Sequence, residues 1–490
     1  MPIFRSLLLA LCLGLFFAPS TAQAAAGCAA LPHEDLTALP DAASQITAAA
    51  PRAGEPLICV VDGYTSRAVG WRLFLPTAWN GKLIQEGCGG RCGALRDTGC
   101  IMLIRRGYAC IAADLGHAGS NFDAVWAIDN PVAEMDAAFR ATHVANRVAR
   151  EVVRRFYGRA PTRVYYTAVS AGGRQGLISA QRYPDDFDGI IVGGPAMTRG
   201  AAFDRFPSVM AWASSLLAPN GHVLLSSGRI RALHAAVLAA CDRADGLADG
   251  VVALPLQCRF DPATLACPVA DCLTPPQIAA VRALYAGMPT QDGLDPKIAF
   301  LPGSELAWLG DYVTETDQPG ARVPLGPVPA ANPYESVLLY SADPDLRPFA
   351  ALGHKLLIFQ GLADTITPPG RTIDYVRQVH RTVGAATADR FLRLYLVPGM
   401  AHEPGQPAAD AVDWLGALEA WVEHDQPPTM IVARHLRDAR RMLGPTVPSE
   451  DLTATNTDFT RPIFPFPLVA TYRGGNPADA SSFGSRPALP

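Results

Sequence analysis

The sequence predicts an α/β fold built on a mostly parallel sheet, with a large insertion. Short apolar runs typical of buried strands, such as residues 107–114 and 355–360, alternate with helical stretches such as 131–156. Strands that alternate with helices form parallel sheets with crossover connections. From about residue 200 to 345 this alternation gives way to helices, proline-rich loops and four cysteines. At 490 residues the chain is also too long for one ordinary core.

The N-terminus is typical of an export signal. Arg5 precedes the apolar run 7–17, and small residues then lead to Ala22-Gln-Ala24, an A-x-A cleavage pattern. We therefore expect residues 1–24 to be removed and the mature chain to be secreted or periplasmic. The run is too short for a mature anchor, so no membrane span is expected. As an alternative, Ala25-Ala-Gly-Cys28 resembles a bacterial lipoprotein box with Cys28 as the lipidated residue.

The net charge argues against a nucleic-acid-binding protein, and the cysteine content predicts disulfides. A net charge of -4 offers no basic surface for nucleic acid. Of the 11 cysteines, Cys12 leaves with the signal, and an even number in an exported chain predicts disulfides. Cys88, Cys92, Cys100 and Cys110 lack the C-x2-C spacing that would favour a zinc site. Four cysteines permit three pairings, and the sequence leaves the choice open.

A candidate nucleophile stands where the apolar run 164–169 stops at Ser170. In a nucleophile elbow the serine occupies a strained turn from strand to helix, and the residues two before and two after it must be small. Ala168 and Gly172 meet this requirement and give A-x-S-x-G in place of the usual G-x-S-x-G. The backbone N–H of Ala171 would then be one donor of an oxyanion hole.

A glycine cluster supplies the candidate for the second donor. The stretch Gly87-Cys-Gly-Gly-Arg-Cys-Gly93 directly follows the apolar run 82–85. α/β-Hydrolases place the second oxyanion N–H in such a loop. We expect Gly89 or Gly90 to donate it. The alternative is a flexible loop held together by its own disulfides.

Two later strand-and-loop units supply a candidate acid and base. The run 355–360 leads to Asp364, and the run 391–397 leads to His402. The carboxyl ends of strands are where open α/β sheets build their sites, and the order Ser170, Asp364, His402 is that of the α/β-hydrolase triad. His402 would accept the serine proton and Asp364 would orient the imidazole.

The candidate triad predicts how the chain is divided into domains. Other catalytic bases and other functions remain as alternatives. We expect an α/β-hydrolase catalytic domain over residues 25–200 and 346–490, with a lid over 201–345. His117 and His143 are alternative candidates for the base. The same triad also serves amide-cleaving or acyl-transferring enzymes, and a catalytically silent binding protein could share the fold.

An acidic loop in the insertion is a candidate cation site. Asp242, Asp245 and Asp249 lie at short intervals in a glycine-broken segment. Their carboxylates repel one another unless a hard cation or solvent separates them, and oxygen-rich loops suit Ca²⁺. The spacing is not that of an EF-hand, and a solvated acidic turn is the alternative.

Several motifs together resemble the tannase and feruloyl esterase family, which includes a bacterial mono(2-hydroxyethyl) terephthalate hydrolase. They are the Gly-Gly-Arg-Gln continuation of the elbow, the stretch 180–191, Asp114-Leu-Gly-His117 and Val397-Pro-Gly-Met-Ala-His402. The resemblance implies a secreted serine esterase that hydrolyses esters of aromatic carboxylic acids of the feruloyl, galloyl or terephthaloyl type. The substrate would be a small aromatic ester, free or attached to a plant polyphenol or polysaccharide.

The resemblance also implies a structural Ca²⁺ site and three disulfides. By that match the ligands would be the side chains of Asp242, Asp245 and Asp249 and the carbonyl groups of Leu247 and Val251. The implied pairs are Cys241 with Cys258, Cys267 with Cys272, and Cys28 with Cys59.

The chain departs from the family at two pairs of cysteines. Family members commonly join the catalytic serine and histidine regions by a disulfide, whereas Val169 and Glu403 stand at those places here. A C-terminal pair is likewise replaced by Phe464 and Gly484. Disulfides among residues 88–110 would instead brace the oxyanion loop. Aromatic residues of the insertion are expected to pack its own core, namely Trp308, Tyr312 and Tyr334.

Overall fold

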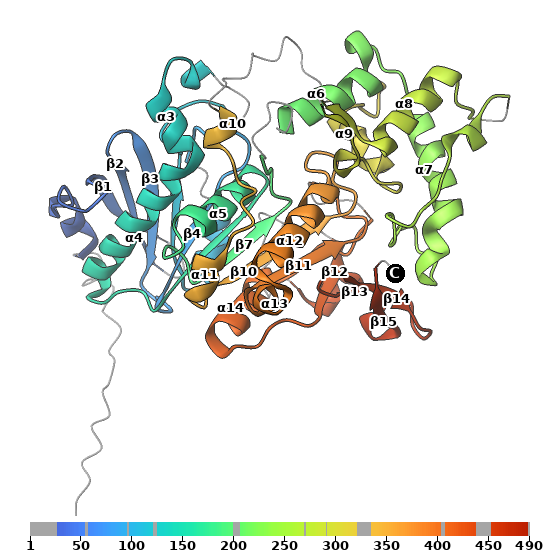
Figure 1. Ribbon diagram of the computed structural model, residues 1–490. Coiled ribbons are helices and arrows are strands. Elements are labelled where there is room, and N and C mark those ends of the chain that lie inside the picture. The colour runs from blue at the N-terminus through green and yellow to red at the C-terminus, as the bar shows by residue number, and fades with distance from the viewer. Residues whose placement is uncertain are drawn as a thin grey trace, which may run out of the picture.

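A nine-stranded sheet runs through the protein, whose structure is a computed structural model (Figure 1). The structure describes residues 27–53, 57–95, 98–120, 125–198, 206–268, 271–290, 292–320, 335–402, 407–437 and 452–488. The strand order is β1-β2-β3-β5-β4-β6-β7-β10-β11. The strands are β1 (Ser44–Arg52), β2 (Ile58–Thr65), β3 (Val69–Pro76), β4 (Lys82–Glu86), β5 (Ala109–Ala113), β6 (Arg163–Val169), β7 (Gly189–Gly193), β10 (Lys355–Gly361) and β11 (Leu392–Val397).

Most of the sheet is parallel. Strands β5, β4, β6, β7, β10 and β11 pair with their neighbours in parallel. Strands β1, β2 and β3 form an antiparallel extension, and β3 also pairs antiparallel with β5. The predicted mostly parallel α/β sheet is therefore confirmed. Its parallel strands end at one common edge, to which the loops after them bring their side chains.

Helices cover both faces of the sheet (Figure 1). Alternation along β6 shows why both faces are apolar, because Tyr165 packs in one core layer and Tyr166 in the other. The predicted helix over 131–156 is present but contains one π-helical turn, Asp136–Arg140. The layer of Tyr166 includes α4 (Ala141–Tyr157), α5 (Ala171–Arg182), α12 (Pro369–Val383) and α13 (Ala385–Phe391), and the layer of Tyr165 includes α2 (Thr98–Arg105) and α14 (Trp414–His424).

The segment between β7 and β10 forms a helical unit with its own apolar core (Figure 1). Trp308 and Tyr312 are fully buried in that core, which confirms their expected structural role. Tyr334 lies outside the described residues. The main helices of this unit, at the place where a lid is predicted, are α6 (Phe206–Leu217), α7 (Ser227–Cys241) and α8 (Pro275–Ala286).

The C-terminal part of the chain adds two small antiparallel sheets. Strand β12 (Ile431–Leu436) pairs with β13 (Thr457–Ile463), and β14 (Leu468–Tyr472) pairs with β15 (Phe483–Pro487). Arg461 of β13 forms an ion pair with Asp249 of the lid at 2.6 Å. The C-terminal strands therefore contact the segment inserted between β7 and β10.

Disulfides account for every cysteine from Cys28 onward. The three pairs implied by the family resemblance are present, and the four cysteines whose pairing the sequence left open form two local bridges. Because the sulfur of Cys28 is bonded to Cys59, it is not available for a lipid. The predicted export signal lies outside the described residues. The bridges are Cys28–Cys59, Cys88–Cys92, Cys100–Cys110, Cys241–Cys258 and Cys267–Cys272.

Among the described residues, no helix combines the length and apolar character needed to cross a membrane.

A network of ion pairs fixes α14 against the sheet. Glu419 accepts hydrogen bonds from Lys82 at 2.7 Å and Arg106 at 2.8 Å, and the hydroxyl of Tyr108 also donates to it. The Lys82, Arg106 and Glu419 side chains are each less than one fifth exposed. Burial and the neighbouring Glu419 carboxylate raise the pKa of Tyr108, so its hydroxyl remains a donor.

Replacement of Glu419 tests the contribution of this network. We expect Glu419→Ala to lower the free energy of unfolding by about 2 kcal/mol, because two partly buried cations lose a shared partner. Urea denaturation followed by circular dichroism measures the change. As a control, Arg282→Ala breaks the exposed pair with Asp261 and should leave the unfolding midpoint unchanged. Equal effects of the two substitutions would contradict this account.

Candidate active site

Ser170 occupies the sharp turn between β6 and α5. Its backbone has φ 59° and ψ -126°, a conformation that residues other than glycine rarely adopt. Hydrogen bonds from its N–H to the Gly193 carbonyl at 2.9 Å and from the Ala196 N–H to its own carbonyl at 2.9 Å hold this turn. A β-carbon at Gly172 would lie 2.5 Å from that of Ala168. The small residues predicted around the serine are therefore required by close packing.

Asp364 and His402 meet at the ends of neighbouring strands. Asp364 follows β10 and His402 follows β11, and the Asp364 Oδ2 atom lies 2.9 Å from His402 Nδ1. Both side chains are buried, with 2% and 8% of their surfaces exposed. This contact selects the tautomer in which Nδ1 carries the hydrogen and Nε2 is the basic nitrogen.

The loop after β7 brings Ser170 to the same place. Gly193 accepts the Ser170 N–H, and a β-carbon on the next residue, Gly194, would lie 2.9 Å from Asp364 Oδ2 and 3.6 Å from His402 Nδ1. The three residues predicted as a triad therefore gather at one edge of the sheet. Glu403, which follows the histidine, lies outside the described residues.

Two side chains that the sequence analysis missed complete the setting of Asp364. Thr367 Oγ1 donates to Asp364 Oδ2 at 2.6 Å, and Gln360 Nε2 lies 3.2 Å from the same oxygen. The backbone N–H groups of Ile366 and Thr367 donate to Oδ1 at 2.9 and 2.8 Å. A glutamine inside the apolar run of β10 was the available signal, since a buried amide needs polar partners.

The two alternative candidates for the catalytic base, His143 and His117, make other contacts. His143 Nδ1 lies 2.8 Å from Asp186, and its ring stacks on Tyr183. The ring of His117 stacks on Trp126 with centroids 3.6 Å apart. His402 is the histidine that faces Asp364.

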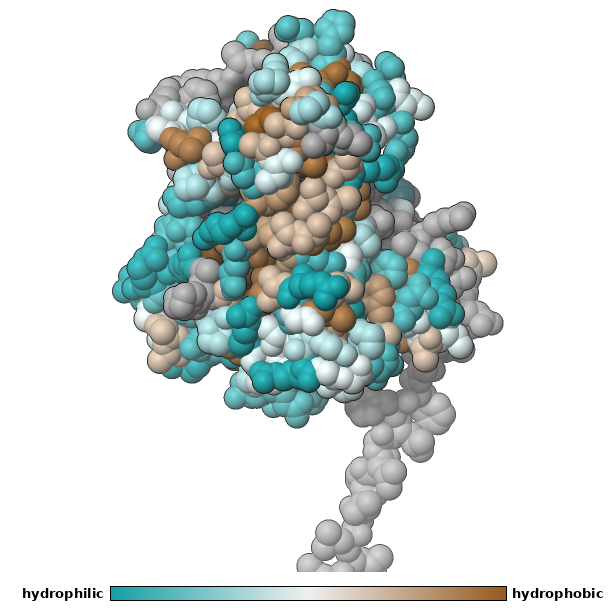
Figure 2. All heavy atoms as spheres, turned by 90° about the vertical axis from the view of Figure 1, so that its right-hand side faces the viewer, coloured by the Kyte–Doolittle hydropathy of each residue, from teal (hydrophilic) through white to brown (hydrophobic). Residues whose placement is uncertain are grey.

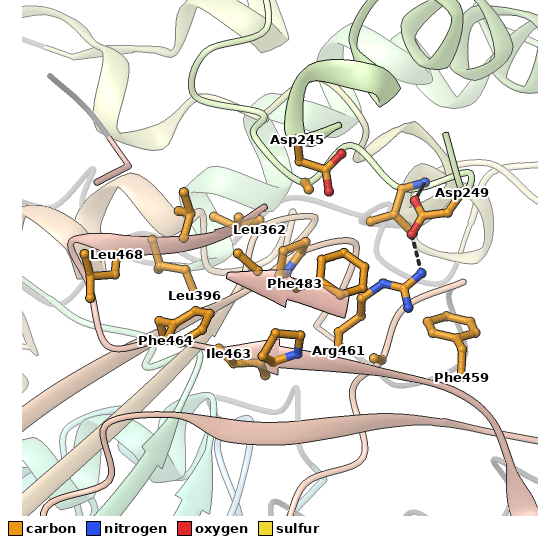
Figure 3. A pocket seen from close by; sticks show the side chains of 17 residues that line it. Asp245, Asp249, Leu362, Leu396, Phe459, Arg461, Ile463, Phe464, Leu468 and Phe483 are labelled. Carbon is orange, nitrogen blue, oxygen red and sulfur yellow. Dashed lines mark hydrogen bonds and ion pairs between the residues drawn. The ribbon is translucent and has the colours of Figure 1, made fainter. Parts of the chain in front are cut away.

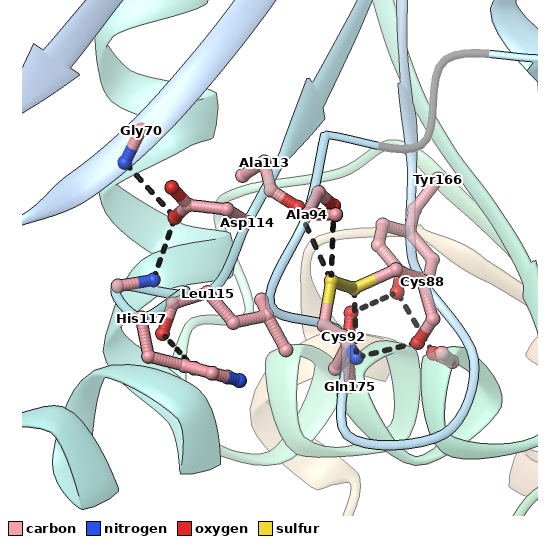
Figure 4. Close-up of a disulfide and its surroundings, with 12 residues drawn as sticks. Gly70, Cys88, Cys92, Ala94, Ala113, Asp114, Leu115, His117, Tyr166 and Gln175 are labelled. Carbon is pink, nitrogen blue, oxygen red and sulfur yellow. Dashed lines mark hydrogen bonds between the residues drawn. A yellow bond between two sulfur atoms is a disulfide. The ribbon is translucent and has the colours of Figure 1, made fainter. Parts of the chain in front are cut away.

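The glycine-containing loop of residues 87–93, in which the second oxyanion donor is predicted, lies against the start of α5 (Figure 4). A β-carbon at Gly172 would be 3.3 Å from the Cys88 nitrogen, so the loop passes directly over the first turn after Ser170. Ala171 begins α5, and Gly89 and Gly90 are partly exposed on the loop. A disulfide between Cys88 and Cys92 closes the loop on itself.

The carboxylates of the acidic loop have partners within the protein. Asp242 accepts hydrogen bonds from the backbone N–H groups of Asp249 and Gly250, and Asp249 pairs with Arg461. Burial, together with the carboxylates of Asp249 and Asp242 and against opposing backbone hydrogen bonds, raises the pKa of Asp245 to about 6. Among the described residues, no group of three or more histidine, cysteine or acidic side chains is arranged to hold a metal ion.

A pocket lies between this acidic loop and the C-terminal strands (Figure 3). Its accessible volume is about 50 Å³, enough for a few water molecules. Leu362 and Leu396 form part of its wall, and Arg461 lies between the rings of Phe459 and Phe483. Figure 2 shows apolar side chains gathered on the face of the molecule that carries the lid and these strands.

A serine elbow and an aspartate–histidine pair at the carboxyl ends of a mostly parallel sheet define an α/β-hydrolase-like protein. The family model described as tannase and feruloyl esterase matches residues 57–325 and 327–486. The chain belongs to this family and is a carboxylic ester hydrolase.

Relatives and solved structures agree with this assignment. The chain is 30% identical to an uncharacterised esterase of Xanthomonas campestris, over 87% of this chain and 84% of that protein. It is 29% identical to the mono(2-hydroxyethyl) terephthalate hydrolase of Piscinibacter sakaiensis, over 93% and 84%. The structure resembles feruloyl esterase B from Aspergillus oryzae with a TM-score of 0.78, at 22% identity and over 94% and 100% of the two chains. That likeness shows the fold.

Replacement of Thr367 tests the contribution of its hydrogen bond to the Asp364 carboxylate. We expect Thr367→Val to lower kcat for ester hydrolysis about 10-fold, because the carboxylate loses one of its donors, with KM nearly unchanged. Thr367→Ser keeps the hydroxyl and should restore most of the rate. Steady-state kinetics on methyl ferulate measures both. A valine variant as active as the wild type would show that the hydroxyl is dispensable.

Proposed function

We propose that this protein is an exported serine esterase that hydrolyses esters of aromatic carboxylic acids. The observation that carries the proposal is the 2.9 Å contact between His402 and Asp364 at the edge of the sheet where Ser170 occupies its strained turn. A histidine oriented in this way is a general base for a neighbouring hydroxyl group.

Acylation would begin with proton transfer from Ser170 to His402 Nε2. The serine oxygen attacks the ester carbonyl carbon, and the imidazolium that forms is stabilised by the Asp364 carboxylate. Negative charge develops on the carbonyl oxygen, where the N–H of Ala171 and that of Gly89 or Gly90 would donate hydrogen bonds. His402 then gives its proton to the leaving alcohol, which leaves an acyl-enzyme.

Deacylation would repeat these steps with water as the nucleophile. His402 takes a proton from the water, hydroxide adds to the acyl carbon, and the same N–H groups receive the charge. The bond to Ser170 then breaks as His402 returns the proton to the serine oxygen, and the aromatic acid is released.

The substrate class is supported by the names of the relatives. One relative hydrolyses mono(2-hydroxyethyl) terephthalate, and others in Aspergillus are probable feruloyl esterases. Both acyl groups are aromatic. We propose that this enzyme acts on a small aromatic ester, free or attached to a plant polyphenol or polysaccharide.

Export is supported by the five disulfides, because such bridges persist in oxidising compartments. The segment 1–24 has the sequence features of a signal for this route.

A structural Ca²⁺ in the lid is part of the same proposal. The side chains of Asp242, Asp245 and Asp249 and the carbonyls of Leu247 and Val251 would hold it. These are hard oxygen donors of the kind that Ca²⁺ prefers, and a cation would stabilise the charged form of Asp245, whose pKa is raised by burial and, to a smaller extent, by the neighbouring carboxylates. It would stabilise the lid and take no part in bond cleavage.

Ser170→Ala tests the proposed function directly. We expect hydrolysis of methyl ferulate, methyl gallate and mono(2-hydroxyethyl) terephthalate to fall by at least about 10⁴-fold, because the acyl-enzyme no longer forms. Product release followed by chromatography measures it, and labelling by a fluorophosphonate should vanish in parallel. Failure of the folded wild type to hydrolyse any of the three esters would overturn the proposal.

Calcium removal tests the lid site. A chelator should lower the thermal midpoint of the wild type, and added Ca²⁺ should restore it, because a ligand that binds only the folded state stabilises that state. Asp245→Asn should abolish this response, whereas Asp261→Asn, at an exposed position of the same lid, should retain it. An identical midpoint with chelator and with Ca²⁺ would contradict the site. Differential scanning calorimetry measures all three proteins.

A further inference from the structure

We propose that Gln175 is a positioning residue that aims the Gly89 N–H at the oxyanion. The inference rests on the proposed function and identifies how the second oxyanion donor is oriented. Gln175 lies in α5, about one turn after Ser170, and its side chain is buried at 3% exposure. It does not contact the reacting atoms in this account and acts through the oxyanion loop.

Gln175 is held at both ends of its amide group (Figure 4). Its Nε2 atom donates to the Cys88 carbonyl oxygen at 2.9 Å. Its Oε1 atom lies 3.2 Å from the hydroxyl of Tyr166, which itself lies 2.8 Å from the carbonyl oxygen of Gly172. These contacts determine which end of the amide faces the loop.

Because the peptide bond is planar, the hydrogen bond from Gln175 to the Cys88 carbonyl also determines the direction of the Gly89 N–H. The Cys88 carbonyl and the Gly89 N–H belong to one peptide unit, which is trans. In a trans peptide the two groups point in opposite directions. Because the carbonyl points to Gln175 inside the protein, the Gly89 N–H points away from it. A β-carbon at Gly89 would meet no atom within 4 Å, so this residue stands on the open side of the loop.

The rest of the loop is held by contacts that do not involve Gln175. The Cys88–Cys92 disulfide and the hydrogen bond from the Cys92 N–H to the Gly89 carbonyl at 3.2 Å close residues 88–92 into a ring. Beyond the ring, the Gly93 N–H donates to the Asp114 carbonyl at 3.2 Å. Loss of the Gln175 contact would therefore free the first peptide unit to rotate while the ring stays closed.

The test compares Gln175→Leu with a matched variant of the same helix. Gln181 also donates through Nε2 to a backbone carbonyl, that of Ser341 at 2.9 Å, but does not belong to the loop contacts. We expect Gln175→Leu to lower kcat for methyl ferulate by about 10- to 100-fold with KM within about 2-fold, because an oxyanion donor acts mainly in the transition state. Gln181→Leu should retain wild-type kcat.

Inhibitor binding separates positioning from a general packing defect. An arylboronic acid forms a tetrahedral adduct with the serine, so its affinity should fall in proportion to kcat/KM in Gln175→Leu. Affinity for the product acid, ferulate, should stay unchanged. Tyr166→Phe keeps the Gln175 donor and should cause a smaller loss of both kcat and boronate affinity. If Gln175→Leu does not fold, the kcat and boronate affinity of Tyr166→Phe test the role of Gln175 instead.

Three results would overturn the inference. They are an unchanged kcat in folded Gln175→Leu, an equal loss of boronate and ferulate affinity, and, where Gln175→Leu does not fold, wild-type behaviour of Tyr166→Phe. Absence of turnover by the wild type would instead overturn the proposed function, and the inference with it. Thermal midpoints of all variants show which of them are folded.

Discussion

The common edge at which the parallel strands end is the constraint on which this protein depends. Backbone pairing of β6, β7, β10 and β11 places the residues after these strands side by side, although about 230 residues separate Ser170 from His402. The sheet therefore brings the candidate catalytic residues together, and each of them lies only a few residues beyond the end of its strand. Gly194 shows how closely these loops pack, because a β-carbon there would lie 2.9 Å from Asp364 Oδ2 and 3.6 Å from His402 Nδ1.

The Asp364 carboxylate at this edge has protein partners on both of its oxygens. Asp364 accepts from two backbone N–H groups and from Thr367, and lies beside Gln360 and His402. Fixed donors of this kind cost no reorganisation during reaction and keep one oxygen directed at the imidazole. The serine–histidine disulfide common in the family is absent here, and rigidity at this place comes from hydrogen bonds and close packing.

The sequence was sufficient for the fold class and for the strand ends after which Ser170, Asp364 and His402 lie, because these signals are local. Each of Ser170, Asp364 and His402 follows an apolar run, and strand ends are readable from such runs. The supporting residues were not readable in this way. Thr367 and Gln360 contribute only once the loop after β10 has folded back on the strand. The pairing of Cys88 with Cys92 likewise depends on the path of a loop, which composition does not determine.

The insertion leaves the sheet after β7 and returns at β10, and these two strands pair directly. A long stretch of chain is therefore attached at adjacent points of an uninterrupted scaffold. Its two ends remain neighbours whatever lies between them. Such an arrangement allows the inserted segment to change in length and sequence while the strands that precede Ser170, Asp364 and His402 keep their register.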